Sequence, residues 1–290
     1  MYEKIRPLLI SIYLHLFVFR KKKKLVLCYY GIGDTAFTLL FAKDLFEKYK
    51  RNNQKVVFVC KKSQADLFRL FKIDSVIIDN HLNRLIAIYC HRFKIQENRW
   101  VLYAGYTFSD QWKKLDGKYA INDYHDSILK IDKPISIEYP VISSEISNKI
   151  NDYGVSKESV IISPYTNSSE NLPLEFWDGI VEKLKKHGYS VYTNVSKSQQ
   201  ALKGTIRLDA TLFDMFYIST LAKCFIGYRG GMCDYIALSD SHLFVVVNKM
   251  WSEKKWDVNG FSKNPTITID YSKQDEAVIF QTLIEYINEL

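Results

Sequence analysis

The residues of this sequence that are best suited to ligand binding or catalysis lie in two glycine-containing turns. In the later one, Cys224–Asp234, the sequence CFIGYRGGMCD runs from an apolar, strand-like stretch into a helix start. The adjacent glycines Gly230 and Gly231 let the backbone approach a ligand closely, and the N–H groups from Met232 onward carry partial positive charge. Arg229 adds a planar fork of donors that matches phosphate oxygens. The segment predicts a pyrophosphate-binding turn.

The same residues also allow a purely structural interpretation. A glycine pair permits a tight bend without any ligand, and Arg229 could pair with a carboxylate such as that of Asp234. The position of the turn between a strand and a helix favours the phosphate interpretation over the structural one.

The earlier turn, GIGDTA at Gly31–Ala36, follows an apolar run and matches the loose dinucleotide pattern G-x-G-x-x-A. A site for NAD needs an acidic residue at the end of the second strand, where it binds the ribose hydroxyls. That strand ends here in Cys60-Lys61-Lys62, which argues against NAD and leaves NADP open. Asp34 is either a catalytic carboxylate or the N-cap of the following helix.

A polar loop, SPYTNSSEN at Ser163–Asn171, follows the first strand-like run of the second half. Ligands of open parallel sheets bind at the carboxyl ends of the strands. Thr166, Asn167 and Ser168 could therefore donate hydrogen bonds to phosphate or sugar oxygens. An ordinary surface loop would have the same composition.

Apolar strand-like runs alternate with helix-periodic segments in both halves, which predicts parallel sheets covered by helices. Residues 25–30 predict a strand and residues 35–49 a helix. A second helix, over residues 175–187, follows Pro173 and ends at Gly188, which is placed for a C′ cap. We therefore predict an α/β fold of two Rossmann-like domains facing each other across a cleft. The predicted parts are an N-terminal segment (1–24), a first domain (25–141) and a second domain (155–290).

Composition narrows the classes of function. The net charge of +8 favours an anionic partner, either a membrane surface or a phosphate-bearing substrate, and no nucleic-acid recognition motif is present. Five cysteines without a C-x-x-C pair and six histidines without a zinc-binding spacing predict no metal site. A D-x-D tripeptide, a P-loop and a G-x-S-x-G elbow are all missing from the sequence.

The first 24 residues combine an almost wholly apolar run, Pro7–Phe19, with five consecutive cations, Arg20–Lys24. The run is too short to cross a bilayer, which takes about 20 apolar residues. Leu8, Ile12, Leu16 and Phe19 have helical spacing and predict one apolar stripe. The segment is either an interfacial helix on an anionic leaflet or a helix packed on the first domain.

Three segments, in this order, resemble the bacterial heptosyltransferase-like glycosyltransferases of GT-B architecture. The G-x-G-D turn of that family is matched by Gly31–Asp34, and its His-Pro-Gly-like loop loosely by Ser163-Pro164-Tyr165. Its late segment, which begins fIGnDSGpmHlAa, is matched by Phe225–Ala237. The motifs are short, and they predict the fold class better than the substrate.

This sequence departs from the family pattern on the donor side. Arg229 occupies the position of a family Asp, and Asp234 that of a family His. Glu170-Asn171-Leu172 replaces the Lys that usually follows the second-half loop. These departures favour a nucleotide sugar other than ADP-heptose.

The resemblance implies an inverting, metal-independent glycosyltransferase of polysaccharide, lipopolysaccharide or capsule synthesis, acting on a cell-surface glycan or lipid-linked acceptor. Asp34 would be the general base, and Gly31, Gly33 and Thr35 would form the acceptor-side loop. Arg229, Gly230, Gly231 and Met232 would bind the donor diphosphate together with Thr166, Asn167 and Ser168. We expect a cytoplasmic protein, peripheral on the inner face of the bacterial membrane if residues 1–24 bind lipid. An NADP-binding oxidoreductase and a non-catalytic nucleotide-sugar binding module remain as alternatives.

Overall fold

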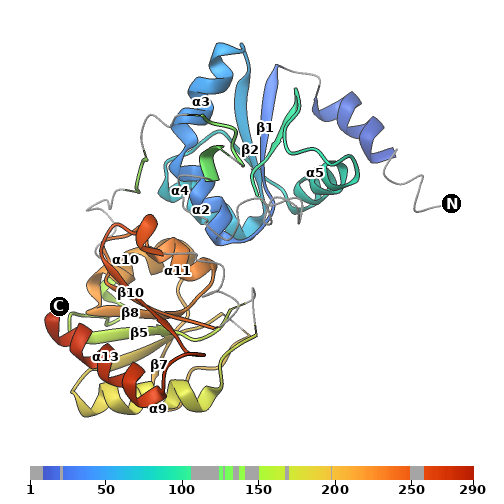
Figure 1. Cartoon of the computed structure of the whole chain (residues 1–290). Helices are drawn as coiled ribbons and strands as arrows, with labels where there is room; N and C mark the ends of the chain where they lie inside the picture. The colour runs from blue at the N-terminus through green and yellow to red at the C-terminus, as the bar shows by residue number, and fades with distance from the viewer. Residues whose placement is uncertain are drawn as a thin grey trace. The chain divides into compact units, whose positions relative to one another are not determined.

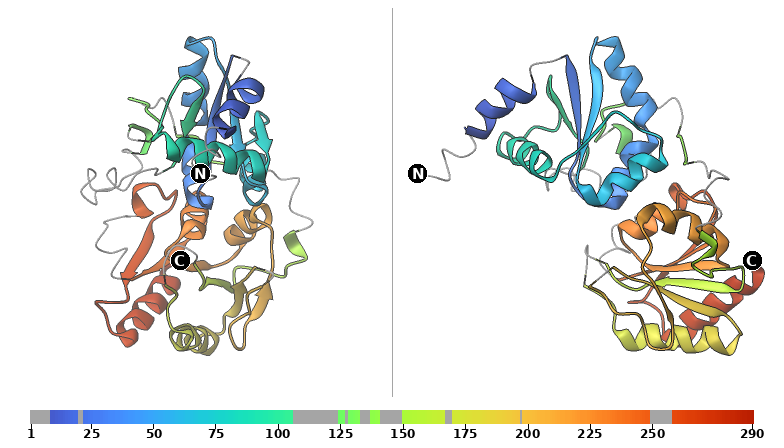
Figure 2. Two further views of the ribbon diagram at one scale, coloured as in Figure 1. Left: turned by 90° about the vertical axis from the view of Figure 1, so that its right-hand side faces the viewer. Right: turned by 180° about the vertical axis from the view of Figure 1, so that it is seen from behind.

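The computed structural model divides into two compact units, Met1–Tyr139 and Pro140–Leu290 (Figure 1). It describes residues 9–19, 22–105, 124–126, 128–132, 137–140, 150–166, 170–196, 198–248 and 258–290. Each unit is built on one sheet of parallel strands with helices on both faces, so the predicted fold class of two Rossmann-like domains is confirmed (Figures 1 and 2).

Unit 1 contains a sheet in the order β3-β2-β1-β4. Its strands are β1 (Lys23–Cys28), β2 (Lys55–Cys60), β3 (Val76–Ile78) and β4 (Val101–Tyr103). Its helices include α2 (Ile32–Leu40), α3 (Ala42–Arg51), η2 (Lys62–Gln64), α4 (Ala65–Leu70) and α5 (Asn80–Arg92).

The strands of unit 1 are apolar on both faces because helices cover both faces (Figure 1). Leu25 and Leu27 of β1 belong to a core cluster with residues of α5. From the other face of β2, the ring of Phe58 meets those of Phe46 and Phe68, from α3 and α4, at centroid distances of 5.8 and 5.6 Å. This two-sided burial explains why the strands are continuous apolar runs in the sequence.

Unit 2 has a sheet in the order β10-β9-β8-β5-β6-β7. Its strands are β5 (Ser159–Ser163), β6 (Ser190–Asn194), β7 (Ile206–Leu208), β8 (Cys224–Tyr228), β9 (Leu243–Val247) and β10 (Thr266–Asp270). Its helices include α9 (Leu174–Lys186), α10 (Leu212–Leu221), α11 (Gly231–Ile236), η4 (Val258–Gly260) and α13 (Glu276–Glu289). Trp177 of α9 and Leu283 of α13 lie in the main core cluster of this unit.

Three elements differ from the prediction. The helix expected over residues 35–49 is interrupted at Phe41. This fully buried residue joins α2 to α3 in the chain. Strands β7 and β10 were not predicted. β7 is a three-residue edge strand, whereas β10 alternates threonine with isoleucine, the pattern of a half-buried strand. The C′ cap of α9 is confirmed, since Gly188 has a φ of +86° and its N–H donates to the carbonyl of Lys185.

The N-terminal helix covers residues 9–18, and its last part is the π-helical segment η1 (Leu14–Val18). Ile10, Leu14 and Phe19 are buried in the core cluster that contains α5, so the segment packs on unit 1. The predicted single stripe is wrong at Phe19, which lies on the packed face, while Ile12 and Leu16 are exposed. Leu8 lies outside the described residues.

Candidate active site

The turn at Gly31 lies at the carboxyl edge of the sheet of unit 1, because β1 ends at Cys28 and α2 begins at Ile32. Gly31 is the N-cap of α2, and Asp34 is the third residue of the helix. The interpretation of Asp34 as the N-cap is therefore wrong. The Asp34 side chain is half-buried at the edge where parallel sheets bind ligands.

A buried glutamine fixes this turn. The Gln64 Nε2 group donates to the carbonyl of Tyr30 and to the hydroxyl of Thr35, at 2.7 Å in each case. The Thr35 hydroxyl donates in turn to the carbonyl of Gly31 at 3.0 Å, and Gln64 Oε1 accepts from the N–H of Lys61 at 2.9 Å. Three polar groups of Gln64 and Thr35 thus hold the start of α2 against the end of β2.

Tyr124 supports Asp34 from inside the unit. Its hydroxyl donates to the backbone carbonyl of Asp34 at 3.1 Å and lies 3.0 Å from the hydroxyl of Thr38, which donates to the same carbonyl at 2.8 Å. Burial raises the pKa of Tyr124 well above its ordinary value, and the negative charge of Asp34 adds to the increase. Tyr124 therefore stays protonated and acts as a fixed donor behind Asp34.

A cationic pocket of about 540 Å³ lies at the ends of the neighbouring strands. It is lined by Tyr29, Lys61, Lys62, Ser63, Asn80 and Arg84, so the described residues of its wall supply three cations and no carboxylate. The Lys61 ammonium lies 4.4 Å from the centroid of the Tyr29 ring, and burial lowers the pKa of Lys61. The pocket is suited to a bound anion.

In unit 2, the predicted donor loop lies at the carboxyl ends of β5 and β6. The hydroxyl of Ser163 accepts from Asn194 Nδ2 at 3.2 Å, and the N–H of Thr166 donates to Asn171 Oδ1 at 2.8 Å. Thr166 is therefore at the edge that the sequence predicted. Asn167 and Ser168 lie outside the described residues.

The later glycine turn joins β8 to α11, as expected, with Gly230 before the helix and Gly231 as its first residue. Arg229 is only 2% exposed, and its guanidinium forms an ion pair with the Asp234 carboxylate at 2.6 Å. The structural interpretation of the arginine is thus confirmed. A contact between Arg229 and a diphosphate stays a prediction.

Burial raises the pKa of Asp234, and the adjacent Arg229 charge opposes that increase. Arg229 Nη1 also donates to the carbonyl of Gly230 at 3.3 Å, so the pair holds the backbone of the turn, while Met232 is half-buried at the start of α11. A glycine is required at Gly227, because a Cβ there would lie 2.3 Å from Cys233 Sγ. Close packing between the strand end and α11 therefore sets the shape of this turn.

Sequence reasoning missed Gln64 and Tyr124. Gln64 follows Lys61 at the spacing of a capping box, which is the one signal that pointed to its local role. Tyr124 lies in a stretch without helix or strand periodicity. Within the described ranges of the chain, no group of three or more His, Cys, Asp or Glu side chains could hold a metal ion.

No protein-family model matches this chain, and no curated protein matches its sequence. Solved structures do match it. The E. coli ADP-heptose lipopolysaccharide heptosyltransferase II superposes with a TM-score of 0.64 at 11% identity, over 92% of this chain and 99% of the other. This chain has the GT-B fold of the heptosyltransferases.

Two further structures agree. A family 9 glycosyl transferase from Veillonella parvula matches with a TM-score of 0.55 at 12% identity, over 92% of this chain and 91% of that one. The E. coli heptosyltransferase WaaC, in complex with ADP-2-deoxy-2-fluoro heptose, matches with a TM-score of 0.54 at 10% identity, over 92% and 99% of the two chains. At such identities the likeness establishes the fold, so the residue roles must be argued from this chain.

Proposed function

We propose that this chain is an inverting, metal-independent glycosyltransferase that transfers a sugar from a nucleotide-sugar donor to a cell-surface glycan or lipid-linked acceptor. The observation that carries the proposal is the half-buried Asp34 carboxylate at the carboxyl edge of β1, on a turn whose backbone is held by Gln64, Thr35 and Tyr124. The heptosyltransferase fold supports it, since WaaC in that group binds an ADP-sugar.

Asp34 acts as the general base. Its carboxylate takes the proton of the acceptor hydroxyl while that oxygen forms a bond to the anomeric carbon of the donor. The bond between this carbon and the diphosphate oxygen breaks, and the nucleoside diphosphate leaves with the electron pair. Attack from the face opposite the leaving group inverts the anomeric configuration.

The donor diphosphate binds to the backbone N–H groups that follow Gly230, at Gly231 and Met232, with hydroxyl and amide donors from Thr166, Asn167 and Ser168. Arg229 is 2% exposed and paired with Asp234, so it acts by holding the backbone of this turn in place. Hydrogen-bond donors at the departing diphosphate take the part that a metal ion plays in other glycosyltransferases.

The acceptor carries an anionic group near the reacting hydroxyl. The pocket of Lys61, Lys62 and Arg84 lies at the same sheet edge as the turn that holds Asp34. Its cations would neutralise a phosphate or a carboxylate of the acceptor. Gly31 is exposed and would form the neighbouring wall, whereas Gly33 and Thr35 are buried and shape the turn from inside.

A nucleotide-binding screen tests the donor class. UDP, GDP, ADP and CMP are titrated against the chain by calorimetry, with NADP in parallel, and a diphosphate is expected to bind at least tenfold more tightly than its nucleoside. Turnover with the corresponding sugar nucleotides is then measured as the release of that diphosphate. Binding of a diphosphate without turnover on any acceptor would instead support a non-catalytic binding module.

An NADP-dependent oxidoreductase is the second candidate, because Lys61 and Lys62 directly follow β2 and the chain has a G-x-G turn after β1. In that architecture the end of the second strand meets the ribose end of a dinucleotide, and cations there accept a 2′-phosphate. Tight binding of NADP with no binding of nucleoside diphosphates would favour this candidate over the transferase.

A further inference from the structure

The N-terminal helix has two apolar faces, and folding uses only one of them. Ile10, Leu14 and Phe19 are at most 7% exposed and pack into unit 1. Four other large apolar side chains lie at the spacing of a second helical face, and we call them the outer stripe: Leu9, Ile12, Tyr13 and Leu16, which are 59, 47, 47 and 44% exposed. A contiguous apolar patch of this kind marks an interaction surface.

The packed face fixes the orientation of the outer stripe. The ring of Phe19 stacks on that of Trp100 with centroids 5.3 Å apart and an interplanar angle of 7°. The His15 ring lies edge-on to Trp100 at 4.6 Å and to Tyr89 of α5 at 6.0 Å. Figures 1 and 2 show the helix on the outside of unit 1, beside α5. These ring contacts hold the helix against unit 1 and leave the outer stripe facing away from the core.

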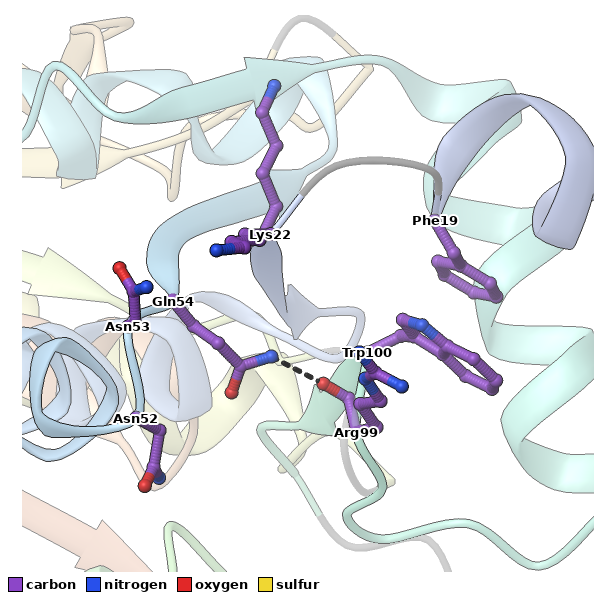
Figure 3. Close-up of a pocket in the computed structure, with 8 residues that line it drawn as sticks. Phe19, Lys22, Asn52, Asn53, Gln54, Arg99 and Trp100 are labelled. Atoms are coloured by element: carbon purple, nitrogen blue, oxygen red, sulfur yellow. Dashed lines mark hydrogen bonds between the residues drawn. The ribbon is translucent and has the colours of Figure 1, made fainter.

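Cations follow this helix in the sequence and line a pocket at its end. The sequence has no carboxylate from Lys4 to Gly33, and the helix leads directly into Arg20–Lys24. At that end, Lys22, Lys23 and Arg99 line a pocket of about 440 Å³ next to Phe19 and Trp100 (Figure 3). The described lining of this pocket contains no acidic side chain.

The neighbouring helix continues the pattern. The Phe93 ring, 49% exposed at the end of α5, lies 5.3 Å from the ring of Tyr89, which itself contacts Phe19. Arg92 and Lys94 flank Phe93, and no carboxylate occurs from Asn80 to Gln96. Lys24 is buried and paired with Glu97, but Lys22, Arg92, Lys94 and Arg99 are exposed. Apolar side chains bordered by exposed cations match an anionic lipid surface in both polarity and charge.

We propose that the outer stripe docks in the interface of an anionic phospholipid bilayer, with Lys22, Lys23 and Arg99 on the lipid phosphates. The apolar side chains enter the boundary between headgroups and acyl chains, and the cations stay at headgroup level. None of the helices in the described part of the chain has the length and apolar character needed to span a bilayer, so attachment is peripheral. This inference stands independently of the proposed catalytic activity.

The test is co-sedimentation of the full chain with vesicles of phosphatidylcholine alone and with 30% phosphatidylglycerol, about one lipid in three. We expect binding to the anionic vesicles only, weakening as salt is raised. Ile12→Gln/Leu16→Gln should lower the partition coefficient about tenfold or more, because both changes remove the inserted surface without touching the packed face. Lys22→Gln/Arg99→Gln should lower it about fivefold per cation.

Two control variants make the same kinds of substitution in unit 2, away from the outer stripe and its cations. Ile206→Gln/Val278→Gln removes two apolar side chains of similar exposure, 52 and 50%, from unit 2. Lys183→Gln/Lys203→Gln removes two exposed cations from the same unit. Neither control should alter vesicle binding by more than twofold, or by about 0.4 kcal/mol.

Three results would overturn the proposal. One is equal binding of the wild type and the Ile12/Leu16 variant to anionic vesicles. Another is equal binding of the wild type to neutral and anionic vesicles. The third is a wild type that sediments as a dimer and an Ile12/Leu16 variant that sediments as a monomer, with equal vesicle binding by both. That result would assign the outer stripe to contact with a second copy of the chain. Point variants replace a truncation at Leu25, because such a truncation would remove Ile10, Leu14 and Phe19 from the core.

Discussion

The two glycine turns have the same local plan, in which a buried strand passes through glycine into a helix, but they use charge in opposite ways. In unit 1, Asp34 is half-buried, and its backbone carbonyl accepts from the neutral hydroxyls of Thr38 and Tyr124, while Gln64 holds the carbonyl of Tyr30 at the start of the turn. In unit 2, Arg229 and Asp234 neutralise each other beneath the turn. A strand–glycine–helix pattern therefore indicates where a binding or catalytic site can form. The packing behind the turn decides whether its charged side chain faces a substrate or the core.

The largest expected effect tests the role of the Asp34 carboxylate. Asp34→Asn should lower turnover by about 10²- to 10⁴-fold, because an amide cannot accept the acceptor proton. Unfolding free energy should fall by less than about 1 kcal/mol, since the change removes only a favourable charge at a helix start. Steady-state kinetics and urea unfolding measure the two quantities.

Asp66→Asn is the matched control, because Asp66 is also a half-buried carboxylate in the first turn of a helix in unit 1. Its turnover should stay within about twofold of the wild type. Near-normal turnover in Asp34→Asn would show that Asp34 has no catalytic role and that the contrast between the two turns is structural only.

The second effect tests the buried ion pair. Arg229→Ala leaves the Asp234 carboxylate without its counter-charge and should cost about 3–5 kcal/mol of unfolding free energy. Arg229→Met/Asp234→Leu removes both charges and should recover most of that loss. If the single variant unfolds at the same urea concentration as the wild type, the pair does not stabilise the turn.

The loss in Arg229→Ala should depend on pH. Burial already raises the pKa of Asp234 above the ordinary value of 3.8, and removing Arg229 raises it further. A carboxyl whose folded pKa is raised stabilises the fold at low pH, and this contribution is lost as pH rises through the folded pKa. The deficit relative to the wild type should therefore grow from about pH 4 toward pH 7. A deficit that is constant over this range would assign the loss to packing instead.

The third effect concerns the close approach of strand and helix in unit 2. Gly227→Ala places a methyl group 2.3 Å from Cys233 Sγ and should cost about 1–3 kcal/mol through overpacking. Adding Cys233→Ala removes the clashing sulfur and should return part of this loss. A double-mutant cycle with no coupling between the two positions would argue against this contact.

The smallest effect concerns the backbone support in unit 1. Gln64→Leu keeps the approximate shape but leaves the carbonyl of Tyr30 and the N–H of Lys61 without their partner, at a cost of about 1–3 kcal/mol. Turnover should fall about tenfold as the turn that carries Asp34 loosens. Gln54→Leu, which removes one hydrogen bond to the carbonyl of Arg99 in the same unit, should leave turnover unchanged. If Gln64→Leu and Gln54→Leu show equal turnover, Gln64 does not position Asp34.

The order of residues was enough to predict the parallel sheets, both glycine turns and the helix α9, whose ends lie one residue before the predicted ones. Strands buried on two faces are continuous apolar runs, and caps such as Gly188 depend on local backbone geometry, so both leave a signal in the order of residues. The weak edge strand β7 lacks that signal because only Leu208 is buried. Strand β10 differs from β7, because threonine alternates with isoleucine over Thr266–Ile269, and such a period-2 pattern does predict a strand.

The side that each functional group faces depends on tertiary packing between elements, some of which are distant in the sequence. Arg229 and Asp234 are five positions apart, and their pairing depended on how α11 folds back against β8. Gln64 and Tyr124 reach the turn at Gly31 from distant segments, at separations of 33 and 90 residues from their backbone partners Gly31 and Asp34. The N-terminal helix had apolar residues all around it, and packing against α5 chose Leu14 and Phe19 for the core and left Ile12 and Leu16 outside. Contacts of this kind depend on three-dimensional packing between elements, which residue periodicity does not encode.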